Sequence, residues 1–254
     1  MGFLNKRKMT LKETLLKLEC QIHKNSRASK IIYYHDINDE NKHQAFARDA
    51  TSFNLFKRHL EVINSCGFTI VDQITKPEGE LTIGFDDGWA GILDVKDYLF
   101  EKKIYPTISI APGLLNLDGY LTSNEVKVLH QEGCRIICHT WTHQSITLYN
   151  NYEKALRREL SDSKKFLEDL LSEEIDTICY PQGRFSFTTY EKALEYGYKE
   201  LWTCIDGNYY DEVFPLARRR NLVQHVSEKE MRWVLLGPNK IKAKRHFRML
   251  YTDS

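Results

Sequence analysis

The sequence predicts an α/β fold in which parallel strands are joined by helical crossovers and arranged as a (β/α) barrel. Short apolar runs alternate along the chain with stretches of helical periodicity, a pattern typical of βα units and a parallel sheet. The residues of strongest chemical character directly follow apolar runs, where (β/α) barrels place their active sites. At 254 residues, the chain has a length at which barrels often remain single domains.

The expected strands are short apolar runs rich in β-branched and aromatic residues. They are Lys30–Tyr34, Thr69–Val71, Leu81–Phe85, Thr107–Ile110, Arg135–Cys138, Thr177–Tyr180 and Glu200–Cys204. Helical periodicity marks the segments between and after them. These segments are Ser52–Ser65, Trp89–Glu101, Ser123–Glu132, Tyr152–Leu171, Phe187–Tyr196 and Ser227–Leu235. Ser227 with Glu230 three residues on is typical of a helix start.

We expect a helical N-terminal extension over residues 1–29, a barrel domain over residues 30–236, and a basic C-terminal tail over residues 237–254. Charged residues interrupt the segment from Leu11 to Glu19, which favours an amphipathic helix over a signal peptide. No run of eighteen apolar residues occurs, so we expect a cytoplasmic protein without a transmembrane segment. A net charge of +1 gives no global electrostatic attraction to nucleic acid.

The C-terminal tail carries six basic residues among the nine from Lys240 to Arg248. We favour the interpretation that this tail is simply solvated. The alternative is weak contact with an anionic membrane surface or with the phosphates of a sugar nucleotide.

Two adjacent acids, Asp86 and Asp87, end the apolar run from Leu81 and are followed by Gly88. Because side chains alternate along a strand, the strand delivers the two carboxylates to different sides of its end. Ionised carboxylates are buried only when they are paired, hydrogen-bonded or bound to a metal. The pair therefore predicts a partner, and a metal ion with a water satisfies both acids.

Two histidines, His139 and His143, follow the apolar run Arg135–Cys138. A spacing of four residues on a helical turn brings both imidazoles to one face. Two histidines and a carboxylate are a common ligand set for a catalytic metal. We therefore expect the aspartate pair and the histidine pair to share one metal ion.

These motifs resemble those of the polysaccharide deacetylases, the NodB-homology or carbohydrate esterase family 4 enzymes. Phe85-Asp-Asp-Gly88 and His139-Thr-x-x-His143 resemble the first two family motifs, and Cys179-Tyr-Pro-Gln-Gly183 resembles the third. Ile31-Ile-Tyr-Tyr-His35-Asp is similar to the Tyr-His opening of the branch that deacetylates poly-N-acetylglucosamine. The match runs from about residue 30 to residue 225. It implies an irregular (β/α)7-type barrel, the NodB-homology fold.

The resemblance also implies roles for residues of this chain. Asp87, His139 and His143 would hold a divalent metal, with zinc expected and iron, cobalt, nickel or manganese as alternatives. Asp86 would be the general base. The Pro181–Gln182 segment would contribute a main-chain N–H to the oxyanion of the reaction, where the family often has tyrosine in place of Gln182.

Two histidines compete for the role of general acid. In the poly-N-acetylglucosamine branch the Tyr-His motif supplies it, which here gives His35. Many other family members use a Leu-x-x-His motif, and Leu222-Val-Gln-His225 matches it. We favour His35, because it ends a strand on the expected active-site side, whereas His225 precedes a helix start.

One family feature is missing. Many relatives carry an arginine before the third motif that orients the base, and Thr177-Ile-Cys-Tyr180 has none. Arg184 or one of Arg218 to Arg220 could supply that charge. We favour a solvated or structural role for this arginine cluster.

The expected function is that of a metal-dependent N-deacetylase, a hydrolase of a linear amide bond that acts on an acetamido sugar in a polysaccharide or glycan precursor. A deformylase or O-deacetylase of the same fold is an alternative, since the catalytic set does not identify the acyl group. A catalytically silent carbohydrate-binding relative is another, although the four intact residues argue against it. A two-histidine, one-carboxylate iron oxygenase is disfavoured by the strand–helix alternation.

Overall fold

The computed structural model describes residue 14, residues 17–18, 21–22 and 26–38, and the continuous stretch 50–252. Within these ranges, no helix is long and apolar enough to cross a membrane. Most of the expected N-terminal helix, from Leu11 to Glu19, lies outside the described residues.

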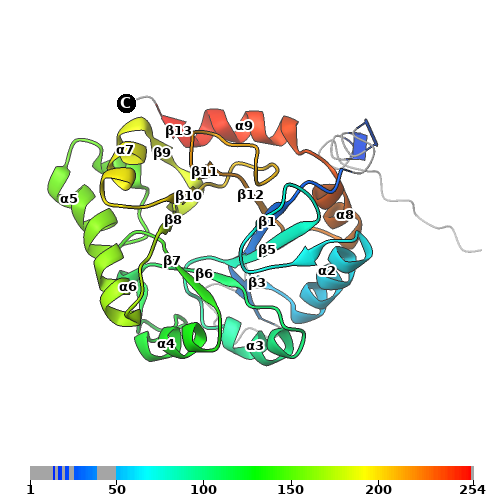
Figure 1. Cartoon of the computed structure of the whole chain (residues 1–254), viewed down its shortest axis with the longest axis horizontal. Coiled ribbons are helices and arrows are strands. Elements are labelled where there is room, and N and C mark those ends of the chain that lie inside the picture. Colours follow the sequence, from blue (N-terminus) through cyan, green and yellow to red (C-terminus); the bar gives the residue numbers. More distant parts are fainter. Residues whose placement is uncertain (1–13, 15–16, 19–20, 23–25, 39–49, 253–254) are drawn as a thin grey trace, which may run out of the picture.

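A strongly curved sheet of parallel strands forms the centre of the molecule (Figure 1). The strands, in their order across the sheet, are β11 (Ala217–Arg218), β10 (Glu200–Trp202), β8 (Thr177–Cys179), β7 (Arg135–Cys138), β6 (Thr107–Ile110), β5 (Glu80–Phe85), β1 (Lys30–Tyr34) and β12 (Arg220–Leu222). Strand β4 (Thr69–Ile70) adds to one end of β5.

The barrel is nearly closed by the last two strands of this sheet. Only Arg219 separates β11 from β12 along the chain. Strand β11 pairs with β10, while β12 pairs with β1 at the other end of the sheet. Counted as one interrupted strand, β11 and β12 complete seven positions around the barrel. The prediction of an irregular (β/α)7-type barrel is confirmed.

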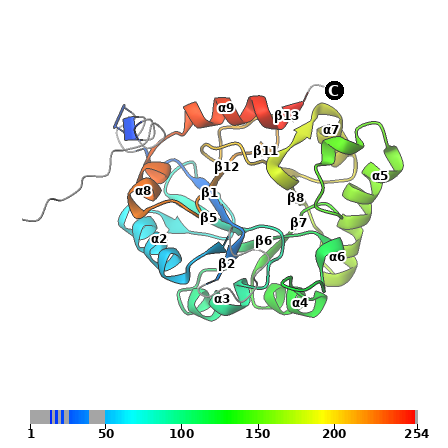
Figure 2. The same cartoon turned by 180° about the vertical axis from the view of Figure 1, so that it is seen from behind.

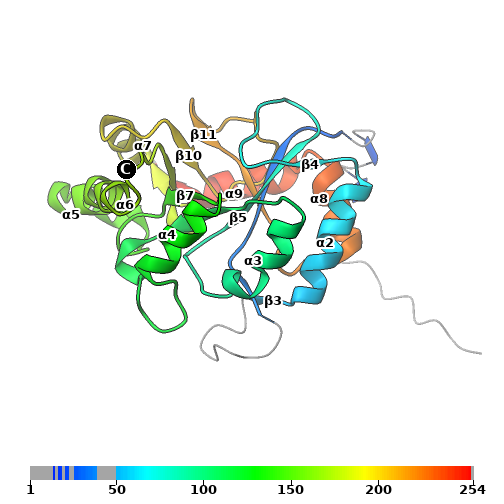
Figure 3. The same cartoon turned by 60° about the horizontal axis from the view of Figure 1, so that its bottom comes forward.

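Helices surround the barrel on its outside, as Figures 2 and 3 show. They are α2 (Phe53–Ser65), α3 (Ile92–Glu101), α4 (Ser123–Gln131), α5 (Glu153–Arg157), α6 (Ser163–Leu171), α7 (Phe187–Glu195) and α8 (Glu228–Leu236). Ser227 and Glu230 form the expected capping box of α8. The long helix expected over Tyr152–Leu171 contains a π-helical turn at Arg158–Asp162.

The C-terminal segment differs from the expected solvated tail. Residues Lys240–Leu250 form helix α9, which lies along the barrel wall near β11 and β12 (Figures 1 and 2). Ala243 is buried, and Phe247 and Leu250 pack against the core. Strand β13 (Tyr251–Thr252) then pairs with β9 (Phe185–Ser186). The segment is thus a packed helix and not a free tail, because its apolar residues cover the barrel, whereas Lys240, Lys244 and Arg248 stay exposed as a solvated segment requires.

Two further strands, β2 (Asp36–Ile37) and β3 (Ala50–Thr51), pair beyond the end of β1. Thr51 is tied to the strand that follows β12, because its hydroxyl donates to the main-chain oxygen of Gln224. The β2–β3 pairing, together with strand β1, therefore fixes the backbone on both sides of His35, which stands between β1 and β2.

Candidate active site

The expected metal ligands come together from two strands of the barrel. Asp87 follows β5, His139 follows β7, and β6 lies between these strands. Asp87 (φ 73°) and His143 (φ 61°) both have left-handed backbone conformations. Such conformations are uncommon in non-glycine residues and cluster at functional sites. The backbone is thus held in an unfavourable shape where the ligand set is assembled.

Asp87 accepts contacts from both histidines. Its Oδ1 lies 3.2 Å from His139 Nε2 and 2.9 Å from His143 Nε2. Trp89 Nε1 donates to the other carboxylate oxygen over 3.2 Å. Burial raises the pKa of Asp87, but its contacts with His139 and His143 outweigh burial and hold the pKa well below its usual value. The carboxylate is therefore ionised at neutral pH.

The donor atoms of this cluster fit a divalent metal ion. One atom each of Asp87, His139 and His143 lies within 4.8 Å of the others. His139 Nδ1 lies 2.7 Å from the carbonyl oxygen of Cys179, to which it donates. In a neutral ring this leaves a lone pair on Nε2, directed at Asp87. Facing lone pairs require a proton or a metal ion between them, so the arrangement suits a cation.

A second group of donors, Asp86, His139 and Cys179, is equally compact but suits a metal less well. A thiol binds metals as the thiolate. Burial raises the pKa of Cys179 well above its ordinary value. Asp86 is moreover already engaged by Arg220. The group centred on Asp87 is therefore the better metal site.

The loop that carries the two histidines is fixed by Glu159, a buried residue of the π-helical turn. Its carboxylate accepts hydrogen bonds from the main-chain N–H groups of Trp141 and Thr142, each over 2.9 Å. The Thr142 hydroxyl donates to the other carboxylate oxygen. The role of Glu159 is not evident from the sequence, because this residue lies outside the motif, on the helix that follows it.

Asp86 has a different set of partners from Asp87. Arg220 NH1 lies 2.8 Å from Asp86 Oδ1, and Arg220 NH2 lies 2.9 Å from Oδ2. The Ser109 hydroxyl donates to Oδ1. Arg220 is completely buried, and its guanidinium lies 4.1 Å from the centre of the Tyr33 ring. A bidentate pair of this kind fixes both the charge and the orientation of the carboxylate.

The Arg220 contact corrects the interpretation of the arginine cluster as solvated or merely structural. Burial raises the pKa of Asp86, but the nearby Arg220 guanidinium more than offsets this and lowers the pKa below its ordinary value. Arg220 thus takes the position beside Asp86 that the sequence analysis sought before the third motif. Arg184, the other candidate, follows the Pro181–Gly183 turn.

Pro181 and Gln182 lie in a short turn that follows β8. Gln182 has a left-handed backbone (φ 58°), and its side chain is exposed. Gly183 cannot carry a side chain here, because a Cβ atom would lie 2.4 Å from Cys204 Cβ. This close contact holds the turn against the segment after β10. The oxyanion role of the Gln182 N–H stays a prediction.

The two candidate general acids are joined by one glutamine. His35 Nδ1 lies 2.6 Å from Gln224 Oε1, and Gln224 Nε2 lies 3.3 Å from His225 Nε2. His225 and Gln182 both line a cavity of about 420 Å³ beside the end of β12. Because the amide oxygen accepts from His35 Nδ1, the Nε2 atom of His35 is available for proton transfer. The choice between the two histidines stays a prediction.

The site matches a known family. The family model for polysaccharide deacetylase matches residues 73–201, a span that contains the Asp86–Asp87 pair, both histidines and Gln182. The chain belongs to the polysaccharide deacetylase family. The resemblance noted in the sequence is therefore confirmed.

A curated relative, Bacillus subtilis YxkH, is named for the same family and is 24% identical over 180 residues. That alignment covers 66% of this chain and 62% of YxkH, so the match spans about three fifths of the relative.

Solved structures confirm the barrel fold of this polysaccharide deacetylase family member. The deacetylase PplD of Streptococcus pyogenes is similar with a TM-score of 0.70 at 19% identity, covering 83% of this chain and 99% of PplD. IcaB of Ammonifex degensii gives a TM-score of 0.71 at 18% identity, covering 83% of this chain and 98% of IcaB. At these identities the similarity establishes the fold alone.

Proposed function

We propose that this family member is a metal-dependent hydrolase that removes the N-acetyl group from an acetamido sugar of a polysaccharide or glycan precursor. The observation that carries the proposal is the different environment of two adjacent carboxylates. Asp87 faces two imidazoles, whereas Asp86 is held by a buried arginine. One carboxylate is thus suited to a metal, and its neighbour stays ionised and available as a base.

The proposed metal ligands are Asp87, His139 and His143. Zinc is the metal that we expect, and iron, cobalt, nickel and manganese accept the same ligands. When bound, a divalent metal lowers the pKa of a coordinated water and polarises the acyl carbonyl of the substrate. His139 and Asp87 are oriented for this role by Cys179 O and Trp89 Nε1.

The residues around the metal site move the protons of the reaction. Asp86 accepts a proton from the attacking water, whose oxygen bonds to the acyl carbon. The negative charge on the former carbonyl oxygen is stabilised by the main-chain N–H of Gln182. The carbon–nitrogen bond then breaks, and His35 donates a proton to the departing amine. Acetate and a free amino sugar leave the site.

Gln224 prepares His35 for proton donation. The hydrogen bond from His35 Nδ1 to Gln224 Oε1 fixes the ring and points Nε2 away from the glutamine. Asp86 lies close enough to His35 for the histidine to lower its pKa. A proton donor and a proton acceptor are thus both supplied near the reacting bond, as amide hydrolysis requires.

A deformylase or O-deacetylase activity uses the same residues and remains the second candidate function. The catalytic residues do not identify the acyl group, so substrates that differ only in this group separate the candidates. A carbohydrate-binding protein without activity would not need the Arg220–Asp86 pair, whose burial is costly unless the charge is used or well compensated.

The test compares metal content and acetate release in the native protein and in Asp87→Ala. We expect about one metal ion per chain in the native protein and loss of both metal and acetate release in the variant. Asp169→Ala is the matched control, because Asp169 is an exposed carboxylate on α6. Substrates are N-acetylglucosamine oligomers, UDP-N-acetylglucosamine, and their formamido and O-acetyl counterparts.

The outcomes separate the candidates. Release of acetate from the oligomers or from the sugar nucleotide supports an N-deacetylase and identifies polymer or precursor as its substrate. Metal binding with hydrolysis of only the formamido or O-acetyl compounds would replace the N-deacetylase by the second candidate. A protein with neither metal nor activity would refute the proposed hydrolase.

A further inference from the structure

Three consecutive arginines near the barrel closure have different surroundings. Arg218 forms ion pairs with Glu200 and Glu212, and Arg220 pairs with Asp86. Among the described residues, Arg219 forms no ion pair. Burial lowers the pKa of both Arg219 and Arg220; Asp86 more than offsets burial for Arg220, whereas Asp211 and Asp206 do not offset it for Arg219. Arg219 is therefore the arginine of the three whose charge lacks a paired counter-charge within the described structure.

Arg219 is nevertheless held in a defined position. Its Nε donates to the main-chain oxygen of Asp211 over 2.6 Å, and its NH1 donates to the main-chain oxygen of Asp206 over 3.3 Å. Gly207 gives room for its stem, because a Cβ atom there would lie 2.4 Å from Arg219 Cδ. A guanidinium has five N–H groups. These two contacts to carbonyl groups leave further N–H donors that can face an added ligand.

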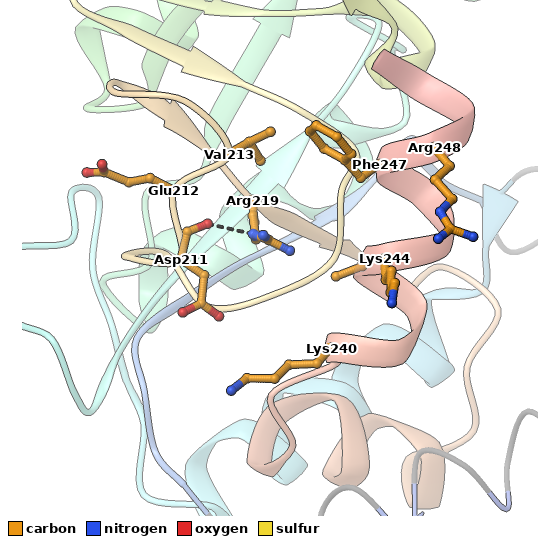
Figure 4. A pocket seen from close by; sticks show the side chains of 9 residues that line it. Asp211, Glu212, Val213, Arg219, Lys240, Lys244, Phe247 and Arg248 are labelled. Atoms are coloured by element: carbon orange, nitrogen blue, oxygen red, sulfur yellow. Dashed lines mark hydrogen bonds between the residues drawn. The ribbon is translucent and has the colours of Figure 1, made fainter. Parts of the chain in front are cut away.

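Helix α9 brings further cations to the same place. Lys240, Lys244 and Arg248 line, together with Arg219, a cavity of about 600 Å³. Figure 4 shows Arg219 and Lys240 projecting into the space between α9 and the loop that carries Asp211. Within the described part of the chain, none of the three α9 cations forms an ion pair. The first turn of α9 contains no acidic residue, although the partial positive charge of a helix start favours anions.

The acidic residues at the cavity do not balance these cations. Asp211 and Glu212 lie on its loop side. Glu212 is already paired with Arg218 over 2.6 Å. Asp211 contributes its main-chain oxygen to Arg219, and its carboxylate, which accepts from the Asn208 N–H, offsets part of the charge of Arg219. The cavity therefore has an excess of positive charge, which attracts anions and would be stabilised by binding one.

We propose that this cavity binds a phosphoryl group carried by a larger organic molecule. Arginine forks and lysine point charges are the side chains that recognise phosphate. Several cations around one cavity suit a multiply charged phosphoryl group better than a single carboxylate. Phe247 on the cavity wall provides an apolar surface for the attached organic group. A free phosphorylated molecule and a phospholipid headgroup offer the same chemistry.

The cavity is linked through Asp206 and α9 to the cavity that Gln182 and His225 line. Asp206, whose main-chain oxygen binds Arg219, pairs through its side chain with Lys242 and His246 on another side of the helix. Lys242 and His246 line the cavity that also contains Gln182 and His225. A ligand bound to Arg219 thus contacts the same loop and helix that border the substrate side.

The test measures binding of inorganic pyrophosphate and of UDP to the full chain by titration calorimetry at low and physiological salt. We expect the Lys240→Ala/Lys244→Ala double variant to bind about tenfold more weakly or worse, because charged hydrogen bonds are lost. Both lysines are exposed, so their loss leaves the core unchanged. Arg245→Ala is the matched control, because Arg245 is an exposed cation on α9 that lines neither cavity.

Cosedimentation with phosphatidylglycerol vesicles distinguishes the two sources of the phosphoryl group. Vesicle binding that pyrophosphate displaces supports a headgroup ligand, and pyrophosphate or UDP binding without vesicle binding supports a free one. No binding to any of these probes would overturn the proposal. An equal loss in Arg245→Ala would also overturn it, since general attraction to a basic helix would then suffice. The readout involves no catalysis, so its result is separate from the deacetylase test.

Discussion

The buried pair of Arg220 and Asp86 gives a prediction about both stability and catalysis. Replacing Arg220 by methionine keeps a long side chain but removes the cation that makes two short contacts with Asp86. The carboxylate is 3% exposed, so water cannot replace the guanidinium. Ser109 would remain as a donor to one oxygen. Arg220→Met therefore leaves a buried charge whose remaining partners, the Ser109 hydroxyl and the Cys179 thiol at 3.9 Å, are neutral.

The expected cost follows from this burial. Removing one member of a buried ion pair lowers the free energy of unfolding by about 3–5 kcal/mol. Asp86→Asn/Arg220→Met removes the unpaired charge as well, so its loss should be smaller than the sum of the two single losses by about 2 kcal/mol. Because Arg220 also orients the proposed base, kcat of Arg220→Met should fall about a hundredfold or more.

The assay is urea unfolding at neutral pH, followed by circular dichroism, with acetate release measured on the same preparations. Arg58→Met is the control, because Arg58 pairs with Glu228 at an exposed site, where the side chains are 50% and 54% exposed. Such a pair is worth at most about 1 kcal/mol. The reasoning would be refuted if Arg220→Met destabilised the protein no more than Arg58→Met, or if the double variant showed simple additivity.

Three further predictions concern His35, Gln182 and His59. His35→Ala should lower kcat about a hundredfold with unchanged metal content. Near-normal turnover in this variant, together with a large loss of kcat in His225→Ala, would assign the role of general acid to His225. If the hydrogen bond to the oxyanion comes from the main-chain N–H of Gln182, Gln182→Ala should change kcat less than about threefold, because the donor is kept and only loss of an oxyanion donor costs much more. A large fall in kcat would assign the role to the Gln182 side chain. Burial lowers the pKa of His59 below 6.5, so the unfolded chain binds the proton more tightly than the folded chain does. The free energy of unfolding should therefore fall as pH drops below 6.5, by up to about 1.4 kcal/mol per pH unit. Urea titrations from pH 7 to 5 should show a shallower dependence in His59→Gln, and an equally steep one would contradict a neutral buried histidine.

The strands were predictable because their signal is local. The expected ranges Lys30–Tyr34, Thr107–Ile110 and Arg135–Cys138 agree with β1, β6 and β7. These strands are buried on both faces, so they read as short apolar runs that helices separate. The parallel order then brings the strand ends together, and this places the Asp86–Asp87 pair and the two histidines at one edge. The local signal was therefore sufficient for most strands of the barrel and for bringing the candidate metal ligands together.

Strands β11 and β12 were missed for the opposite reason. Their residues include three consecutive arginines, which in isolation indicate a solvated surface. Helix α9 was missed similarly, because its six basic residues mask the apolar contacts of Ala243 and Phe247. In β12 a charged residue is buried because a distant partner accepts its charge, and in α9 the apolar residues pack against a distant part of the chain while most basic residues stay exposed. No window of neighbouring residues contains that partner.

Arg220 shows why the site could be predicted only in part. A buried carboxylate requires a cation, but the requirement concerns distance in space and not position in the sequence. In a nearly closed barrel, the last strand lies beside the first. Arg220 on the last strand can therefore contact Asp86 as readily as an arginine placed just before the third motif could. The absence of arginine before Tyr180 was therefore weak evidence against a paired base. Arg220 stands on β12, whose pairing with β1 closes the barrel, and no apolar run in the sequence marks that strand.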